Sequence, residues 1–215
     1  MTGYEKEYHR KAHSFLLDDD EYYLLRAKLA IKNYFSGIPS SAKVLEFGAG
    51  MGQNIFLLKD RQAYDISAFS LNECEKRGIP IIRHKSGIPN NHFDFVLSSH
   101  NLEHMENPLE SLKLLRKKLK KNGKLILILP KEHHKKVGFK PDHNQHLYAW
   151  NFRTINNLLD KAGFKVIENR TIYGTAYHKL KFISRMSFAL YSLKVKTAGF
   201  LLRSSEMKIV AMRRS

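Results

Sequence analysis

Cysteine is almost absent from this chain of 215 residues. The single Cys74 excludes an intramolecular disulfide and fits the reducing conditions of the cytoplasm. No apolar run reaches the length of a membrane span, and no signal-peptide pattern opens the sequence. We therefore expect a soluble cytoplasmic protein, and the hydrophobic fraction of 43% predicts that it is folded.

Acidic residues are also scarce, with 20 Asp and Glu against 37 Lys and Arg and a formal net charge of +17. The basic group at 113–124 suits the solvated face of a helix. The segment 170–215 holds ten Lys and Arg, many aromatic residues and a single acid, Glu206. This second excess indicates an anionic partner: a phosphorylated or nucleotide-linked substrate, an acidic membrane surface, or nucleic acid.

Strand-like and helix-like segments alternate after an N-terminal stretch, 4–35, that reads as helical with an acidic interruption suited to a helix N-terminus. The expected strands are 43–47, 63–67, 80–84, 93–98, 125–129, 164–170 and 207–212, and the expected helices are 53–60, 71–77, 108–120 and 152–162. Asn122-Gly123 is interpreted as the turn that ends helix 108–120. Apolar strands alternating with helices predict an α/β protein whose parallel sheet is covered on both faces.

The segment Glu46-Phe47-Gly48-Ala49-Gly50-Met51-Gly52 follows an apolar strand and lacks side chains at every second position. A ligand can lie against such a backbone. The segment resembles the first motif of the class I S-adenosylmethionine-dependent methyltransferases, whereas a nicotinamide-binding loop has its third glycine one residue later. The resemblance implies S-adenosylmethionine as cofactor, with Glu46 fixing the loop and the methionine amino group. The implied contacts are Glu46, Phe47, Gly48, Ala49, Gly50 and Asn54.

Asp65 comes nineteen positions after Glu46, at the end of the second expected strand. A carboxylate at this place can accept hydrogen bonds from both hydroxyls of a ribose. Tyr64-Asp65-Ile66-Ser67 resembles the second methyltransferase motif, so we expect Asp65 and Ile66 to contact the cofactor. The acid that most relatives place after the third strand, for the adenine amino group, is missing: His84 and Ser86 are the nearest polar candidates.

The segment from Phe93 to Met105 resembles the fourth motif of small-molecule methyltransferases, and the resemblance covers roughly residues 40–170. Because ligands of open α/β sheets bind beyond the carboxyl ends of the strands, Ser99, His100 and Asn101 should face the crevice, with Ser99 near the cofactor. His100 is either the general base for a hydroxyl acceptor or a residue that only lines the pocket.

Further histidines accompany this segment. His100-x-x-Glu103-His104 matches an inverted zinc-protease pattern, but its place beside a glycine-loop crevice argues against that interpretation. It also departs from the E-x-x-E-H pattern with which some ubiquinone-pathway O-methyltransferases hold a divalent ion, so we expect no metal. After the fifth strand, His143 and His146 are expected to face the substrate and Trp150 the core. His100, His104 and His146 are the catalytic candidates.

The resemblance implies a Rossmann-like, doubly wound sheet of seven strands, mostly parallel, with an antiparallel last strand inserted beside the sixth. In one domain we expect an N-terminal helical cap at 1–38, a cofactor-binding core at 39–173, a helical insertion or lid at 174–205, and the last strand at 206–215. A helix around 182–194 would carry one apolar stripe of Phe182, Ile183, Met186, Leu190 and Leu193. The lid's basic Lys179, Lys181 and Arg185 would face a phosphate-bearing acceptor.

The sequence thus predicts a methyltransferase that acts on a small, or lipid- or nucleotide-linked, anionic acceptor, most simply at oxygen. Two alternatives remain open: an RNA methyltransferase, suggested by the charge, and a non-catalytic binding module on the same scaffold. No Asn/Asp-Pro-Pro-Tyr/Phe motif for base amines follows the fourth strand, which argues against the first. A peripheral membrane contact of the lid is a further expectation, and the sequence does not indicate the oligomeric state.

Overall fold

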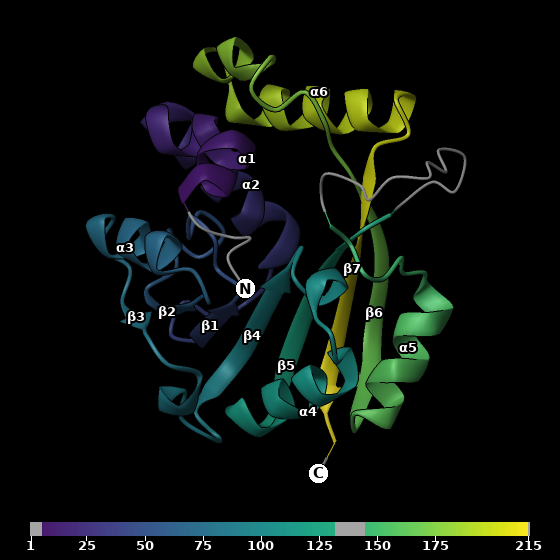
Figure 1. Cartoon of the computed structure of the whole chain (residues 1–215). Coiled ribbons are helices and arrows are strands. Elements are labelled where there is room, and N and C mark those ends of the chain that lie inside the picture. Colours follow the sequence, from purple (N-terminus) through teal and green to yellow (C-terminus); the bar gives the residue numbers. More distant parts are fainter. Residues whose placement is uncertain (1–5, 132–144, 215) are drawn as a thin grey trace.

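The computed structural model describes residues 6–131 and 145–214 of the chain. A seven-stranded sheet in the order β3-β2-β1-β4-β5-β7-β6 forms its centre (Figure 1). The strands are β1 (Lys43–Phe47), β2 (Asp60–Tyr64), β3 (Ile81–Ile82), β4 (Phe93–Ser99), β5 (Leu119–Pro130), β6 (Phe164–Tyr173) and β7 (Ser205–Arg213). The first five run parallel, and β7 lies antiparallel between β5 and β6. The expected strand arrangement is confirmed.

Helices cover both faces of this sheet. They are α1 (Lys6–Asp18), α2 (Asp20–Tyr34), α3 (Ala68–Lys76), α4 (Pro108–Lys118), α5 (Phe152–Lys161) and α6 (Phe188–Leu201), with short 3-10 segments η1 (Lys85–Gly87), η2 (Leu102–His104) and η3 (Lys181–Arg185). On one face Leu115 of α4 and Leu159 of α5 are buried. On the other face Tyr34 of α2 and Cys74 of α3 are buried, which confirms the doubly wound arrangement. None of the helices within 6–131 and 145–214 is long and apolar enough to cross a membrane.

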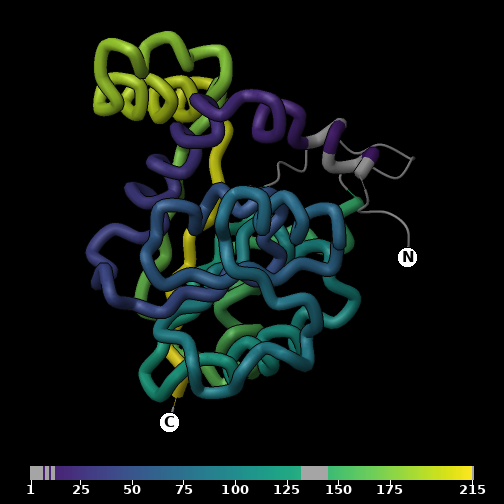
Figure 2. The backbone as a smooth tube through the Cα atoms, turned by 90° about the vertical axis from the view of Figure 1, so that its left-hand side faces the viewer, coloured from purple at the N-terminus to yellow at the C-terminus, as the bar shows by residue number. Residues whose placement is uncertain are grey.

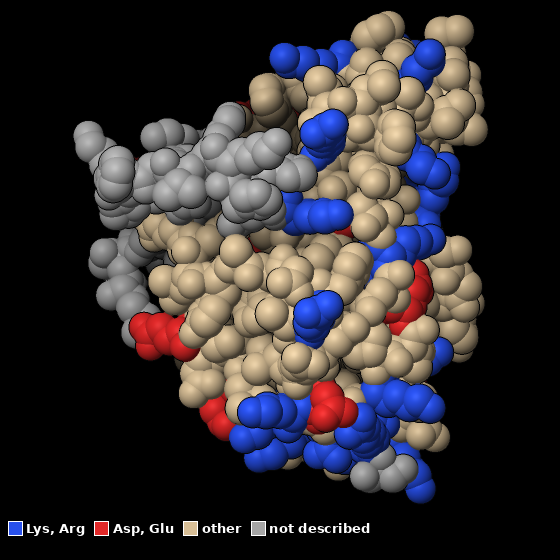
Figure 3. Space-filling view, turned by 90° about the vertical axis from the view of Figure 1, so that its right-hand side faces the viewer, with Lys and Arg blue, Asp and Glu red and all other residues tan. Residues whose placement is uncertain are grey.

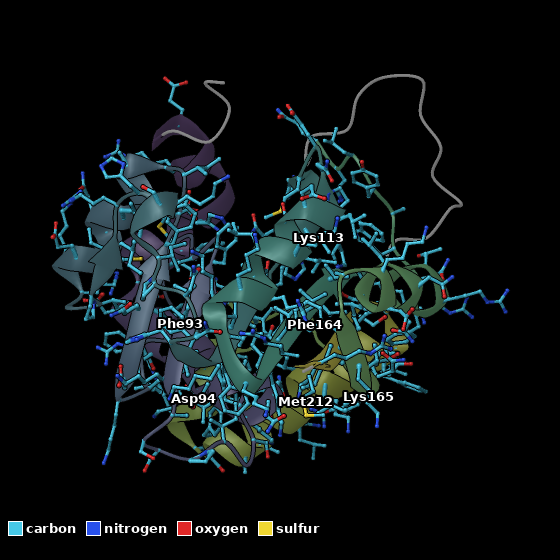
Figure 4. All side chains as sticks on the ribbon, turned by 90° about the horizontal axis from the view of Figure 1, so that it is seen from below. Phe93, Asp94, Lys113, Phe164, Lys165 and Met212 are labelled. Carbon is cyan, nitrogen blue, oxygen red and sulfur yellow. The ribbon has the colours of Figure 1, made fainter. Side chains whose placement is uncertain are left out.

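The two ends of the sheet differ. At the lower end, Phe93 at the start of β4 and Phe164 at the start of β6 are almost completely buried (Figure 4). At the same end Asp94 Oδ1 accepts a hydrogen bond from the Lys120 ammonium at 2.8 Å. Packed side chains and an ion pair fill this end, whereas the rule for open α/β sheets places ligands at the carboxyl ends of the parallel strands.

The N-terminal helical stretch is confirmed over residues 6–34, with its break at the expected acidic position. Asp19 lies between α1 and α2 in an extended conformation, and its side chain accepts a hydrogen bond from the Tyr22 backbone N–H at 2.9 Å. An aspartate at this position satisfies one of the backbone donors that a helix N-terminus leaves open. The second helix therefore starts where the chain supplies its own cap.

The expected helix at 53–60 is wrong. Residues 51–57 form consecutive turns, with the Ile55 N–H bonded to the Gly52 carbonyl and the Leu58 N–H to the Ile55 carbonyl. β2 begins at Asp60, three residues earlier than expected, because Asp60 pairs with Lys43 at the start of β1. The short stretch that remains must bury Ile55 and return to the sheet, which leaves no length for a stable helix.

The interpretation of Asn122-Gly123 as a helix-ending turn is also wrong. α4 ends at Lys118 and β5 begins directly at Leu119. Asn122 takes a left-handed conformation (φ 64°) where the pairing with β4 shifts its register. The dipeptide therefore forms an irregularity within a strand. Asparagine suits this position for the same reason that it suits a helix end, because it tolerates a left-handed backbone.

The expected lid helix is displaced along the chain. η3 and α6 lie within the expected insertion and are called the cap from here on, a name that no longer refers to the N-terminal helices. They stack above the carboxyl ends of the sheet beside α1 (Figure 2). The Ser187 hydroxyl caps α6 by accepting from the Ala189 and Leu190 N–H groups, so the helix begins after the proposed stripe has started. The single stripe is wrong: Ile183 packs in the cap, whereas Phe182, Met186 and Leu193 are exposed.

The cap is held on α2 by both apolar and ionic contacts. Leu25 and Leu29 of α2 pack with the buried Tyr191 and Val195 of α6. The Lys181 ammonium lies 2.6 Å from Asp19 and 3.1 Å from Glu21, while Arg185 lies 3.9 Å from Glu21. Lys181 therefore has its anionic counterpart within the chain, and the expectation that an acceptor phosphate supplies it is corrected.

Candidate functional site

A crevice with a volume of about 1580 Å³ opens at the carboxyl ends of the parallel strands. Small-molecule sites usually occupy about 300–1,000 Å³, and this volume is larger because it also includes a groove along α4 toward the start of β6. Its wall includes the loop after β1, the residues after β2 and β4, and Arg26 and Tyr34 of α2, and it continues along α4 as far as Gly163. The segments that resemble three methyltransferase motifs thus meet at one site.

Two glycines of the loop after β1 have distinct structural roles. Gly48 has φ 80°, and a Cβ there would lie 2.4 Å from the Asn101 side chain, so any larger residue would clash. Gly50 has φ 53°, and a Cβ there would meet nothing within 4 Å. Because Gly50 lines the crevice, this open space is where a ligand can contact the backbone, which fits the cofactor that the sequence predicts.

Glu46 supports this loop from behind. It is completely buried, and its Oε1 accepts a hydrogen bond from Asn54 Nδ2 at 2.6 Å. Burial raises the pKa of Glu46 to about 8, although the hydrogen bond from Asn54 works to lower it. Asn54 lines the crevice together with Phe47 and Ala49, whereas Glu46 lies outside the crevice wall. Glu46 is therefore placed to act on a bound cofactor indirectly, through its hydrogen bond with Asn54.

Asp65 follows the last residue of β2 and joins the glycine loop to the next helix. Its Oδ2 accepts from the Gly50 N–H at 2.8 Å and its Oδ1 from the Ser67 N–H at 2.9 Å. Ile66 beside it is 71% exposed and lines the crevice, so an apolar surface is offered next to a carboxylate. A ribose and a flat base need these two features side by side.

The position that lacks the adenine acid lies at η1. Lys85 lines the crevice there, whereas the sequence-based candidates His84 and Ser86 lie outside its wall. An adenine bound at this place would thus meet Ile66 and the stem of Lys85 in place of a carboxylate.

The end of β4 carries Ser99, His100 and Asn101, which all line the crevice as expected. Asn101 Nδ2 donates to the Phe47 carbonyl at 2.9 Å and so ties the end of β4 to the glycine loop. His100 has an unusual left-handed backbone (φ 48°), and its N–H donates to the Ile128 carbonyl of β5 at 2.9 Å. The backbone at this turn is set by neighbouring strands, and it places the imidazole in the crevice.

The His100 imidazole lies among carboxylates. Its Nε2 is 3.1 Å from Glu206 Oε1, and Glu206 Oε2 accepts from the Tyr34 hydroxyl at 3.1 Å. Its Nδ1 is 3.7 Å from Glu103 Oε1, beyond hydrogen-bond distance. Partial burial works to lower the pKa of His100, but the hydrogen bond and charge of Glu206, with the charge of Glu103, raise it overall. The same pairing with His100 lowers the pKa of Glu206 in spite of burial.

Sequence reasoning missed Glu206 as a site residue. It lies on β7, opposite Pro130 of β5, and is 106 residues from His100 in the chain. The available signal was its isolation, since it is the single acid among the ten basic residues of 170–215. A single carboxylate within a strongly basic segment indicates that this carboxylate pairs with a specific side chain.

The two other catalytic candidates lie together. The rings of His104 and His146 are 4.8 Å apart between centroids, and with Glu103 they form a group whose ligand-type atoms lie within 4.8 Å of one another. The Leu147 and Tyr148 N–H groups bond to the Glu103 carbonyl, which brings the loop at 145–150 onto η2. His143 lies outside the described residues.

Trp150 is only partly as expected. It packs against the core, but it is half-buried and stacks on Tyr148 with ring centroids 5.3 Å apart.

One carboxylate and two imidazoles form a donor set that could hold a divalent cation. The sequence-based expectation is nevertheless a metal-free reaction, and it stays a prediction. We expect turnover to be unchanged by EDTA and not to increase with added magnesium or zinc. Calorimetric titration of the chelated protein with each ion, beside the turnover assay, checks this: tight binding together with restored activity would contradict it.

Comparisons with known proteins agree with this geometry. The family model described as a methyltransferase domain matches residues 19–169, the larger part of the chain. No curated protein sequence matches the chain. A SAM-dependent methyltransferase of Archaeoglobus fulgidus is similar in fold, with a TM-score of 0.60, 18% identity, and coverage of 94% of this chain and 100% of that one.

Two further solved structures are similar in fold. The 1,6-didemethyltoxoflavin-N1-methyltransferase of Burkholderia thailandensis, with bound 1,6-didemethyltoxoflavin and S-adenosylhomocysteine, has a TM-score of 0.61 at 16% identity and coverage of 97% and 84%. A SAM-dependent methyltransferase of Thermotoga maritima has 0.57 at 19% identity and coverage of 78% and 82%. With the family match, the sheet order and the glycine-loop crevice, the chain belongs to the methyltransferase domain family, within the class I S-adenosylmethionine-dependent methyltransferases.

Proposed function

We propose that the chain transfers a methyl group from S-adenosylmethionine to a hydroxyl group of a small or lipid-linked anionic acceptor. The observation that carries this proposal is the placement of His100 in the crevice wall, at 3.1 Å from Glu206 and at the end of the strand next to the glycine loop. A hydroxyl must lose a proton when its oxygen is methylated. An imidazole supported by a carboxylate is the group best suited to take it.

In this proposal the cofactor contacts Asp65, Ile66, Ser99 and the loop from Phe47 to Gly50, with Glu46 acting through Asn54. Bound S-adenosylmethionine supplies an electrophilic methyl group. The side chains around it hold the acceptor in line, and alignment alone can contribute on the order of 7–11 kcal/mol to lowering the barrier.

His100 takes the hydroxyl proton. With Nε2–H donated to Glu206, the Nδ1 atom is the nitrogen left to accept it, and the imidazolium that forms lies between Glu206 and Glu103. Glu206 is itself held by the Tyr34 hydroxyl. His104 and His146, which lie together near the crevice, contribute by orienting the acceptor.

The crevice also contains a cation suited to an anionic acceptor. Arg26 lines it, held by the Tyr22 hydroxyl at 3.2 Å and stacked on the Tyr177 ring at 4.1 Å from the centroid. A guanidinium fixed in this way binds phosphate or carboxylate groups with defined geometry. Arg26 therefore supports an acceptor that carries a negative charge near its reactive hydroxyl.

Mass spectrometry can identify the acceptor. The protein is incubated with S-adenosylmethionine carrying a deuterated methyl group and with an extract of its host cells separated into aqueous metabolites, lipids and RNA. We expect one labelled product in the aqueous or lipid fraction, absent when the Gly50→Val variant is used, and an O-methyl linkage in its fragmentation.

Labelled RNA, with binding that weakens steeply as salt rises, would favour the RNA methyltransferase that the net charge of +17 suggests. S-adenosylmethionine binding without a labelled product in any fraction would favour the non-catalytic module.

A further inference from the structure

The outer surface of the cap is unusually apolar. Six of the thirteen exposed large hydrophobic residues among the described part of the chain fall within 21 positions, and we call them the cap patch. They are Phe182, Met186, Leu193, Phe200, Leu201 and Leu202, with exposed fractions of 64, 79, 57, 63, 72 and 71%. Scattered exposed apolar residues are ordinary on a protein surface, but a concentration within one short segment indicates an interaction site.

The orientation of α6 explains why these side chains face outward. Tyr191, Val195 and Gly199 form the side that packs against the rest of the protein. At 100° per residue, Leu193 and Phe200 lie on the opposite side of the helix. η3 packs on α6 and adds the exposed Phe182. The cap patch is therefore a consequence of how α6 is seated, and it lies on the outermost layer of the molecule (Figure 1).

The charges that the cap segment itself carries are of one sign, although Glu21 of α2 lies beside Arg185 at its edge. Lys179, Arg185, Lys194, Lys196 and Arg203 are exposed, and no acidic residue occurs between 170 and 205. Figure 3 shows Lys and Arg side chains among uncharged ones over the upper part of the molecule. Arg185 lies 3.9 Å from Glu21, but it is 75% exposed. A partner of this surface must accept apolar side chains and supply negative charge.

We propose that the cap patch docks the protein on the surface of an anionic lipid bilayer. Leucine, phenylalanine and methionine side chains can enter the boundary between headgroups and acyl chains, and the flanking Lys and Arg side chains can reach lipid phosphates. A second copy of the chain would bring like charges together. Nucleic acid would use the charges but would leave the exposed leucines and Met186 without a counterpart. A bilayer satisfies both features of the surface.

Flotation with vesicles tests this proposal without reference to methyl transfer. The intact protein is mixed with vesicles of phosphatidylcholine alone, or of phosphatidylcholine with 30% phosphatidylserine, at low and at physiological salt. We expect binding to the anionic vesicles only, weakened by salt because the basic residues are exposed.

Two variants separate the apolar and the electrostatic contributions. Leu193→Ser/Leu201→Ser removes apolar contacts, and Lys194→Glu/Lys196→Glu reverses two charges. Each should weaken binding to the anionic vesicles about tenfold or more, because basic residues near an anionic surface and apolar side chains inserted at its boundary both contribute to membrane affinity.

The matched controls lie elsewhere on the surface. Lys121→Glu/Lys165→Glu makes the same change of charge on exposed residues of β5 and β6, and Ile167→Ser removes an exposed apolar side chain of β6. Both should bind as the unaltered protein does, and circular dichroism melting confirms that every variant is folded.

Absence of wild-type binding to anionic vesicles would overturn the proposal, as would equal binding by all variants. Loss of a dimer in Leu193→Ser/Leu201→Ser, measured by light scattering and without an effect on flotation, would identify a contact between copies instead. A gel shift with RNA that depends on Lys194 and Lys196, in a protein that does not float, would identify a nucleic-acid surface.

Discussion

Replacement of His100 by alanine is expected to lower kcat by about 10²–10⁴-fold and to leave the affinity for S-adenosylmethionine nearly unchanged. The imidazole is the group proposed to take the acceptor proton, and its contacts run to Glu206 and Glu103 and not to the glycine loop. Loss of a general base slows the chemical step without removing cofactor contacts. Turnover with the acceptor identified by mass spectrometry, beside calorimetric titration of the cofactor, measures both quantities.

The backbone of His100 calls for a second variant. Its φ of 48° lies in the left-handed region, where alanine is strained but asparagine is tolerated. His100→Asn cannot act as a base, so it should lose turnover as His100→Ala does while melting close to the wild-type temperature. A loss below tenfold in both variants would leave His100 as a residue that only lines the pocket.

Glu206 provides a test that depends on the sign of a pKa shift. Pairing with Glu206 raises the pKa of His100, and a base must be neutral, so activity should rise with pH as His100 loses its proton. In Glu206→Gln the pKa of His100 falls. The acidic limb of the kcat profile should therefore move to lower pH, while the maximal rate drops because the imidazolium has lost its carboxylate. An acidic limb at the same pH in both proteins would contradict the pairing.

Replacement of Gly50 by valine is expected to weaken binding of S-adenosylmethionine by at least about 100-fold, roughly 2.7 kcal/mol. Gly50 has φ 53°, lines the crevice, and has no atom within 4 Å of the position that a Cβ would take. A branched side chain would occupy the space that the proposed cofactor contacts need. Calorimetric titration with S-adenosylmethionine and its demethylated product measures the loss.

The chain offers a matched control for the backbone strain of this substitution. Gly78 has φ 70° and nothing within 4 Å of an added Cβ, but it lies outside the crevice wall. Gly78→Val should therefore lower the melting temperature as Gly50→Val does, and bind the cofactor normally. Equal affinities in wild type and Gly50→Val would show that the cofactor lies elsewhere.

Asp65 supports the same assignment from the other side of the loop. Asp65→Ala removes the proposed ribose acceptor and also the hydrogen bond to the Gly50 N–H. We expect the affinity of Asp65→Ala for S-adenosylmethionine to be reduced, as in Gly50→Val.

Local patterns were sufficient for much of the fold. Apolar strands, the glycine loop and the acid after the second strand are each encoded within a few neighbouring residues, so the order of elements could be predicted and the sheet was confirmed. The resemblance carried by those residues supplied the antiparallel last strand. Where two local signals competed, prediction failed: Asn122-Gly123 can end a helix or interrupt a strand, and only the pairing of β5 with β4 decides between them.

The sequence by itself determined the family, the cofactor loop and the position of His100 at a strand end. Tertiary structure decided what surrounds His100. Glu206 reaches it because β7 inserts antiparallel beside β5, and Lys181 of η3 meets Asp19 because the cap packs on α2. Such contacts join residues more than 100 positions apart. Strand register and helix packing produce them, and these depend on the whole chain, so no local pattern near His100 or Lys181 could indicate its partner.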